Sequence, residues 1–359
     1  MHLDWKASQP LTVGVEWELQ ILDRDTLQPK DIFGEVYNDL PEGIKPFIHK
    51  EVYKSMLEIV TPPSEDEKGV VSLLGEIIDV LRPVAVKRKF HLVGLGTLFL
   101  RNDRPTEINV SERYKRFAAE FQEILRDFYI YGIHIHIGLP NEEWALRTFN
   151  NLVFFAPLLL ALSANSVFYR GKDTGIHSYR MVVFENLPRA QLPRAFSSYG
   201  EFKRVVYDLK KFGVIETLKD LWWHIRLRPD YGTVEVRVFD SIHDLKRLEL
   251  LVKWVRAIAL YSEKYQEEPL PLEFQIQNWW WAKRYSLDAD FIDGNNRRAL
   301  KQLAYDFIYK LDHLGVLKRL GYRPEEFTAF LRKPALAKDI ALKAKALGLE
   351  RVVRMAAVV

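Results

Sequence analysis

Apolar and polar residues alternate from Leu11 to Ile21 within residues 11–23, a period of two that predicts a β-strand with one buried face. One face would carry Leu11, Val13, Val15, Trp17, Leu19 and Ile21, and the other Gly14, Glu16, Glu18 and Gln20. Shorter segments of similar character predict further strands at residues 57–60, 90–100, 132–139, 222–228 and 233–240.

Helical periodicity separates these strands. Ser64 followed by Glu67 has the spacing of a capping box and predicts a helix that continues to about Lys89. Further helices are predicted at residues 111–129, from Asn141 to about Ser163, and repeatedly beyond His243. Because the strands return without regular βαβ alternation, the pattern favours an α+β fold with a mainly antiparallel sheet and flanking helices.

Composition narrows the classes of protein that this chain can belong to. Its 359 residues are 48% hydrophobic and 28% charged, which is typical of a globular enzyme. The chain contains no cysteine, which excludes disulfides, thiolate metal sites and a cysteine nucleophile. The net charge of +4 comes without long basic runs, so no nucleic-acid partner is predicted. The apolar stretch at residues 152–162 contains Pro157 and is too short to cross a bilayer, so we expect a soluble, cytoplasmic protein.

Ionisable residues recur two positions apart on several of the predicted strands, so that both members of each pair share a face. These pairs are Glu16 and Glu18, His134 and His136, Arg226 and Arg228, and Glu235 and Arg237. Each pair alone also fits a solvated sheet face or, for Arg226, Arg228, Glu235 and Arg237, a cross-strand ion pair. For the histidines, the glycines at both ends of residues 132–138 favour a binding role, because glycine permits close approach of a ligand.

Taken together, the pairs predict a sheet whose one face packs on helices while the other collects carboxylates, imidazoles and guanidinium groups. Mg²⁺ prefers carboxylate and phosphate oxygens, and arginines neutralise the charge on a phosphoryl group in transfer. The pattern therefore favours a platform for metal ions and phosphates. Common alternatives lack their motifs: there is no G-x-x-x-x-G-K-[ST] loop, no third glycine after Gly94 and Gly96, no H-E-x-x-H and no G-x-S-x-G.

Five segments, in order along the chain, resemble motifs of the glutamate–cysteine ligase type 2 family, the bacterial-type carboxylate–amine ligases. They are residues 13–18 (V-G-V-E-W-E), 58–62 (E-I-V-T-P), 132–138 (G-I-H-I-H-I-G), 162–180 (L-S-A-N-S…G-K-D-T-G-I-H-S-Y-R) and 222–237 (W-W-H-I-R…G-T-V-E-V-R). The resemblance extends over roughly residues 11–290. The sequence departs from the family at His224, where aspartate is usual, and at Trp281, where arginine is usual.

The resemblance implies a glutamine-synthetase-like catalytic fold that uses ATP and Mg²⁺ (or Mn²⁺) to phosphorylate a carboxylate such as that of glutamate, followed by attack of an amine. It implies metal ligation by Glu16, Glu18, Glu51, Glu58, His134 and Glu235. It places Arg226 and Arg237 on the transferred phosphoryl group, His136 and Arg228 at the nucleotide, and Thr174, Ser178 and Arg180 at the acid substrate. Residues 1–290 would form the ligase domain and residues 291–359 a helical extension packed on it, in a homodimer.

Three other functions remain open at this point. A guanidino kinase of the same superfamily would stop after phosphoryl transfer, and a non-catalytic regulator would bind the nucleotide without turnover. A metal hydrolase would use the same carboxylates and histidines without ATP.

Overall fold

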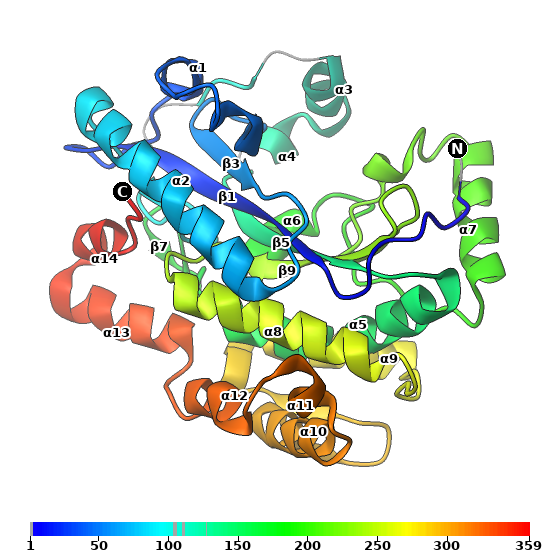
Figure 1. Ribbon diagram of the computed structural model, residues 1–359. Coiled ribbons are helices and arrows are strands. Elements are labelled where there is room, and N and C mark those ends of the chain that lie inside the picture. The colour runs from blue at the N-terminus through cyan, green and yellow to red at the C-terminus, as the bar shows by residue number, and fades with distance from the viewer. Residues whose placement is uncertain (1–2, 103–105, 110–111, 127) are drawn as a thin grey trace.

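A seven-stranded antiparallel sheet lies at the centre of the fold in the computed structural model, which describes residues 3–102, 106–109, 112–126 and 128–359 (Figure 1). Six strands follow one another in the order β2-β3-β1-β5-β9-β8, and β4 also pairs with β1. Their bounds are β1 (Val13–Asp23), β2 (Ile48–Lys50), β3 (Met56–Val60), β4 (Phe90–Val93), β5 (Gly132–Gly138), β8 (Ile225–Arg228) and β9 (Thr233–Asp240). The predicted α+β class is confirmed, since every pairing in this sheet is antiparallel.

The two faces of the sheet differ as the alternation of β1 predicts. Val13, Val15, Trp17, Leu19 and Ile21 are all buried on what we call the helix face. Glu16, Glu18, His134 and His136 lie on the opposite, site face, together with Glu235 and Arg237. The period of two therefore sorts the chain into an apolar core and a charged surface on one sheet.

Three long helices cover the helix face, as Figure 1 shows: α2 (Glu67–Arg88), α5 (Glu142–Ser163) and α8 (Leu245–Tyr261). Helix α5 begins at the predicted residue, because the Asn141 side chain accepts a hydrogen bond from the Trp144 amide at 2.9 Å. By length and composition alone α5 could cross a membrane, but 83% of its most apolar window is buried inside the protein. Its apolar character is explained by its position against β8, β9 and α8.

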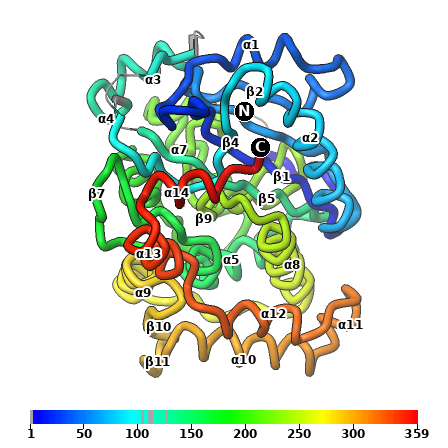
Figure 2. The backbone as a smooth tube through the Cα atoms, turned by 90° about the vertical axis from the view of Figure 1, so that its left-hand side faces the viewer, coloured from blue at the N-terminus to red at the C-terminus, as the bar shows by residue number. Residues whose placement is uncertain are grey.

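The remaining helices surround the sheet and complete the chain. After the last helix, α14 (Leu349–Met355), the chain runs back to the sheet (Figure 2). There the Val358 amide donates to the Leu92 carbonyl at 2.8 Å. These helices are α1 (Phe33–Asn38), α3 (Glu112–Phe121), α4 (Glu123–Arg126), α6 (Tyr179–Phe184), α7 (Tyr199–Lys211), α9 (Leu272–Tyr285), α10 (Leu300–His313), α11 (Val316–Leu320), α12 (Pro324–Leu331), α13 (Leu336–Leu347) and α14 (Leu349–Met355). Two short hairpins, β6 (Phe168–Tyr169) with β7 (Lys172–Asp173) and β10 (Asp290–Ile292) with β11 (Arg297–Ala299), lie outside the main sheet.

Two predicted segments are interrupted. The strand predicted at residues 90–100 ends at Val93, where the chain leaves β1: the Gly94 amide donates to the Ala356 carbonyl at 3.0 Å, and a side chain at Gly94 would come within 2.6 Å of the Ile242 backbone. The helix predicted at residues 111–129 divides at Gln122, whose φ of 40° is left-handed and cannot continue an α-helix. Ser111 and Asp127 of that prediction lie outside the described residues.

The predicted capping box of α2 is also wrong in detail. Asp66, and not Ser64, caps the helix, and its carboxylate accepts from the Gly69 amide at 2.9 Å. The Ser64 hydroxyl instead donates to the Asp66 carbonyl at 2.9 Å. A carboxylate at this position also interacts favourably with the positive end of the helix dipole.

We therefore expect Asp66→Ala to lower the free energy of unfolding by about 1 kcal/mol, since one helical amide loses its acceptor. Urea unfolding followed by circular dichroism measures this difference. Ser64→Ala is the matched control and should cost clearly less. A larger loss for Ser64→Ala than for Asp66→Ala would mean that the cap has been assigned to the wrong residue.

Candidate active site

A cavity of about 490 Å³ opens on the site face of the sheet. Strands β1, β3, β5, β8 and β9 form its floor, and helices α3 and α6 contribute walls. The predicted site residues that line it are Glu16, Glu18, Glu51, Glu58, His134, Arg180, Arg226, Arg228 and Arg237. Predicted residues from β1, β3, β5, β8, β9, α6 and the segment after β2 thus meet in one cavity.

Cross-strand pairing explains how the carboxylates and imidazoles come together. Glu16 lies directly opposite His134 on β5, and Glu18 directly opposite Glu58 on β3. Opposed residues in an antiparallel sheet share a face with their Cβ atoms about 5 Å apart. The ladder itself therefore brings the acidic groups and histidines together.

Glu16 is the centre of the first group of possible metal ligands. Its Oε2 lies 2.7 Å from Nδ1 of His134, and its Oε1 lies 3.2 Å from Nε2 of His136. Burial alone would raise the pKa of Glu16, but the hydrogen bonds and charges of the two histidines outweigh it and hold the pKa well below 4.5. Glu16 is therefore ionised and available as a ligand at neutral pH.

The contact of Nδ1 with the Glu16 carboxylate, which can only accept when ionised, favours the His134 tautomer that carries its proton on Nδ1. When Nδ1 donates its proton to Glu16, Nε2 keeps a lone pair. That Nε2 is buried and has no hydrogen-bond partner among the described residues. Burial, followed by the charge of Arg237, lowers the pKa of His134, which favours the neutral ring that a metal ion requires.

Glu58 is the centre of the other carboxylate groups. One potential ligand atom each from Glu18, Glu51 and Glu58 lie within 4.8 Å of one another, and the same holds for Glu16, Glu58 and His134. Burial raises the pKa of Glu58 well above 4.5, and the charges of Glu51, Glu16 and Glu18 raise it further. No described lysine, arginine or histidine forms an ion pair with Glu58.

These observations test whether the site fits a divalent cation. Four carboxylates on one buried face repel one another, and a bound cation would relieve that repulsion. Carboxylate oxygens are the ligands that Mg²⁺ and Mn²⁺ prefer, and the orphaned Nε2 of His134 suits the softer of the two. The residues present therefore fit the expected metal ions.

Glu235 has a different environment from the other acidic residues, because three arginines surround it. Arg226 on the neighbouring strand donates to both of its oxygens at 2.6–2.9 Å. Arg237 donates to Oε1 at 2.6 Å and Arg228 to Oε2 at 3.3 Å. The cross-strand ion pair that the sequence left open is therefore present.

The charges of Arg226, Arg237 and His136 overcome the effect of burial and hold the pKa of Glu235 well below 4.5. Burial, followed by the nearby charges of Arg237 and Arg228, in turn lowers the pKa of Arg226 to about 10. A carboxylate oxygen of Glu235 also lies within 4.8 Å of a carboxylate oxygen of Glu16 and of a ring nitrogen of His136. Glu235 thus joins the arginine cluster to the carboxylates, although a metal ion there would share it with the arginines.

The three residues predicted at the acid substrate separate in the structure. Arg180 lines the cavity with its side chain almost fully buried. The Ser178 hydroxyl donates to Asp240, and that of Thr174 donates to the Val167 carbonyl at 2.8 Å, so both stabilise a loop. Neither hydroxyl lies on the cavity wall.

An ionic group centred on Glu185, the residue after the cavity-lining Phe184, was not predicted as part of the site. Glu185 accepts from Nε2 of His224 at 3.0 Å and from the Trp279 indole at 2.5 Å, and it forms an ion pair with Lys283. Burial opposes its charge, but His224 and Lys283 outweigh burial and lower the pKa of Glu185 to about 2. The unusual His224 was the signal in the sequence, while Glu185 lies in a helical segment without any motif.

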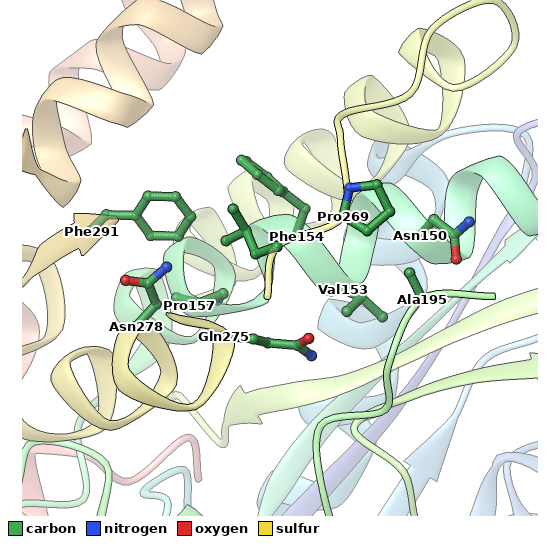
Figure 3. Close-up of a pocket in the computed structure, with 10 residues that line it drawn as sticks. Asn150, Val153, Phe154, Pro157, Ala195, Pro269, Gln275, Asn278 and Phe291 are labelled. Atoms are coloured by element: carbon green, nitrogen blue, oxygen red, sulfur yellow. The ribbon is translucent and has the colours of Figure 1, made fainter. Parts of the chain in front are cut away.

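Figure 3 shows a second pocket, between α5, α9 and the loop at Pro269, which is much smaller than the cavity on the site face. Its volume is about 20 Å³, roughly the space of one water molecule. Its polar side chains bond within the chain, as when Asn278 exchanges two hydrogen bonds of 2.8 Å with the Ile292 backbone. We interpret it as a packing gap and not as a ligand site.

Comparison with known proteins and family models finds similarity to one family over most of the chain. The model of glutamate–cysteine ligase family 2 matches residues 12–312. A relative from Mycobacterium sp. (strain JLS), provisionally named glutamate–cysteine ligase 2-1, is 34% identical over 311 residues, which cover 84% of this chain and 82% of the relative. A relative from Thermobifida fusca (strain YX), provisionally named glutamate–cysteine ligase 2, is 29% identical over 95% of this chain and 91% of its own length.

Among solved structures, the glutamate–cysteine ligase of Francisella tularensis in complex with AMP has a TM-score of 0.69 to this chain. The alignment covers 98% of this chain and 88% of that one, at 15% sequence identity. The two proteins therefore share their fold.

The Glu185 group gives a prediction for stability against pH. Because its pKa falls from 4.5 to about 2 on folding, the ionised carboxylate contributes up to about 3 kcal/mol above pH 4.5, and the contribution declines as the pH falls toward 2. Glu185→Gln should therefore be less stable than wild type at pH 7, with a smaller difference at pH 4. Urea unfolding at both pH values measures it. Glu143→Gln, an exposed control, should show no such trend, and a constant difference for Glu185→Gln would contradict the assignment.

Proposed function

The chain belongs to glutamate–cysteine ligase family 2, and on that premise we propose that it is an ATP-dependent carboxylate–amine ligase. It would phosphorylate a carboxylate such as the γ-carboxylate of glutamate and form an amide with an amine. One observation carries the proposal: clustered acidic residues and four arginines line the same buried cavity. The acidic residues suit bound cations, and the arginines suit the phosphate and carboxylate anions that such cations accompany.

The reaction explains why both kinds of charge are needed. A carboxylate is a poor electrophile until phosphorylation turns one of its oxygens into a leaving group. ATP and the acid are both anions, so the protein must hold them together against their repulsion. Mg²⁺ or Mn²⁺ would be held by Glu16, Glu18, Glu51, Glu58, His134 and Glu235, and when bound supplies positive charge at the phosphates.

The arginines differ in how many donors remain for substrates. Arg226 uses Nε and Nη2 on Glu235 and Nη1 on the Leu221 carbonyl, so it mainly fixes Glu235. Arg237 bonds through Nη1, while its Nε is buried without an acceptor among the described residues. We assign Arg237 to the transferred phosphoryl group. We assign Arg226 to holding Glu235, which in turn holds Arg237. Arg228 and His136 both lie against the Tyr231 ring, and we place the nucleotide phosphates there.

The acid is assigned to the end of the cavity where Arg180 lies. The Arg180 guanidinium lies 5.8 Å from the centre of the Phe184 ring, and Phe184 lies 6.2 Å from Phe128. Phe128, Phe184 and Leu187 form an apolar wall that excludes water from an acyl-phosphate. Thr174 and Ser178 would act on the acid only through the loop that they stabilise.

Several finer expectations remain predictions. They are the use of Mg²⁺ or Mn²⁺, a homodimeric state, a cytoplasmic location, and the division into residues 1–290 as the ligase unit and residues 291–359 as its helical extension.

A direct test of the reaction is a screen of ADP release that crosses glutamate and other acids with cysteine, other amines and hydroxylamine. Hydroxylamine intercepts an acyl-phosphate as a hydroxamate, so the assay separates a ligase from a kinase and from a non-catalytic binder. Absence of ADP release with every combination would overturn the proposed function.

We expect Glu16→Gln and Glu235→Gln to reduce ADP formation at least about a hundredfold, since each removes a charge at the proposed metal sites. Initial rates of ADP release measure the loss, and circular dichroism checks the fold. Glu350→Gln, on the exposed surface of α14, is the matched control and should be fully active. Wild-type turnover in Glu16→Gln would rule out its role as a ligand.

Arg237→Lys should also be severe, because an ammonium group cannot reproduce the fork with which guanidinium binds Glu235 and a phosphoryl oxygen together. We expect kcat to fall by at least about a hundredfold with a smaller change in the KM for ATP. Steady-state kinetics with a varied ATP concentration distinguish the two parameters. Full activity of the lysine variant would show that Arg237 is only a partner of Glu235.

A further inference from the structure

Asp240 is a fully buried carboxylate at the end of β9 that is outside the site residues assigned above. Simple alternation from Val234, Val236 and Val238 would place it on the helix face. A bulge in the pairing of β9 with β5 changes this, because two residues of β9, Arg237 and Val238, oppose the single His134. The register then resumes with Asp240 opposite Gly132, which places Asp240 on the site face.

The Asp240 carboxylate joins both ends of the loop at residues 164–179. Its Oδ2 accepts from the Asn165 amide at 2.9 Å and from the Ser166 amide and hydroxyl at 3.2 and 2.7 Å. Its Oδ1 accepts from the Ser178 hydroxyl at 2.8 Å. One side chain therefore holds residues from the start and the end of the loop.

Gly96 makes this arrangement possible. A side chain at Gly96 would lie 2.7 Å from Cγ of Asp240, so only glycine leaves room for the carboxylate. The Gly96 amide also donates to the side-chain oxygen of Asn165 at 2.8 Å, and the Asn165 amide group donates to the Ser241 carbonyl at 2.6 Å.

The loop leads directly to Arg180 in the first turn of α6. The Ser166 hydroxyl that donates to Asp240 also accepts from the Arg180 amide at 3.0 Å. The Arg180 guanidinium lies against Gly132, where a side chain would collide with it, and donates to the Arg237 carbonyl at 3.2 Å. Asp240 thus reaches the backbone of Arg180 through one hydroxyl, and the side chain of Arg180 lies over the residue that opposes Asp240.

The electrostatics agree with this geometry. Burial raises the pKa of Asp240, while the charge of Arg180 and the donors from Asn165, Ser166 and Ser178 act in the opposite direction. Burial lowers the pKa of Arg180, and the charges of Glu18 and Asp240 oppose that effect. Burying a carboxylate is costly unless it is fully hydrogen-bonded, and four donors satisfy Asp240.

We propose that Asp240 is a positioning residue that sets Arg180 for recognition of the acid substrate, through Ser166 and the loop at residues 164–179. This inference rests on the proposed function, in which Arg180 contacts the acid. Asp240 itself touches no substrate. Its effect should fall mainly on the acid, because the hydrogen bonds of the Asp240 carboxylate with the described residues go to Asn165, Ser166 and Ser178, none of which is assigned to ATP or metal ions.

The test compares Asp240→Asn and Ser166→Ala with Ser262→Ala. Ser166 and Ser262 are both fully buried, and each hydroxyl makes one hydrogen bond as donor and accepts another. Ser262 lies between α5 and α8 and is the matched control for the loss of a buried hydroxyl. Steady-state ADP release is measured with L-glutamate, ATP and hydroxylamine, each varied in turn.

We expect the KM for glutamate to rise at least about tenfold in Asp240→Asn and Ser166→Ala, the scale of one lost charge-assisted hydrogen bond. The KM for ATP and kcat should stay within about twofold, since uniform substrate binding is lost and not the chemistry. Ser262→Ala should leave all three parameters unchanged. An unchanged KM for glutamate in Ser166→Ala, or an equal rise in the KM for ATP, would overturn the inference while leaving the proposed function intact.

Amide hydrogen exchange provides an arm that does not depend on activity. Both test variants should accelerate exchange at residues 165–180 relative to β1 and β5, and Ser262→Ala should not. Unchanged exchange in this segment would overturn the role of Asp240 as its anchor. If wild type releases no ADP with any acid, the proposed function fails, and the exchange result still decides whether Asp240 positions the loop. Should Asp240→Asn fail to fold, Ser166→Ala carries both arms.

Discussion

Repulsion among like charges on one face of a buried sheet is the constraint on which this structure depends. The ladder places Glu18 opposite Glu58 with Glu16 on the same face, and Glu51, which directly follows β2, reaches the same group. No described lysine, arginine or histidine forms an ion pair with Glu58. In a low dielectric such a group is tolerable only with counterions or protons. The raised pKa of Glu58 shows the second solution, and a bound cation would be the first.

The arginines at the other end of the same face complete this arrangement. Glu235 holds three guanidinium groups that would otherwise repel one another, and its ligand atoms also meet those of Glu16 and His136. Acidic and basic groups therefore lie side by side within one cavity. Such a mixture suits a complex of cations with phosphates better than either charge alone would, because the acidic groups can contact the cations and the arginines the phosphate oxygens.

Much of this could be predicted from the sequence, because it follows from a period of two. Alternation in β1, β5 and β9 was enough to place Glu16, His134 and Glu235 on one face. Prediction failed where the period is broken or where a contact spans the chain. The bulge opposite His134 moves Asp240 to the other face, and Glu185 meets His224 and Lys283 only through the packing of α6 and α9. The helix cap could be assigned to Ser64 or to Asp66, because both residue types cap helices, and the left-handed φ of Gln122 has no signal in its residue type.

The bulge has a consequence for how the two halves of the reaction are kept together. Glu235, on the regular part of β9, and Arg237, at the bulge, face the end of the cavity proposed for the phosphates, whereas Asp240, beyond the bulge, holds the loop that leads to Arg180. A single strand of eight residues thus supports both ends of the cavity. In the proposed reaction, this shared support would hold the phosphoryl group and the acid that receives it at a constant distance. Because both ends of the loop are tied to the same carboxylate, we expect changes in its outer residues to leave that distance unchanged.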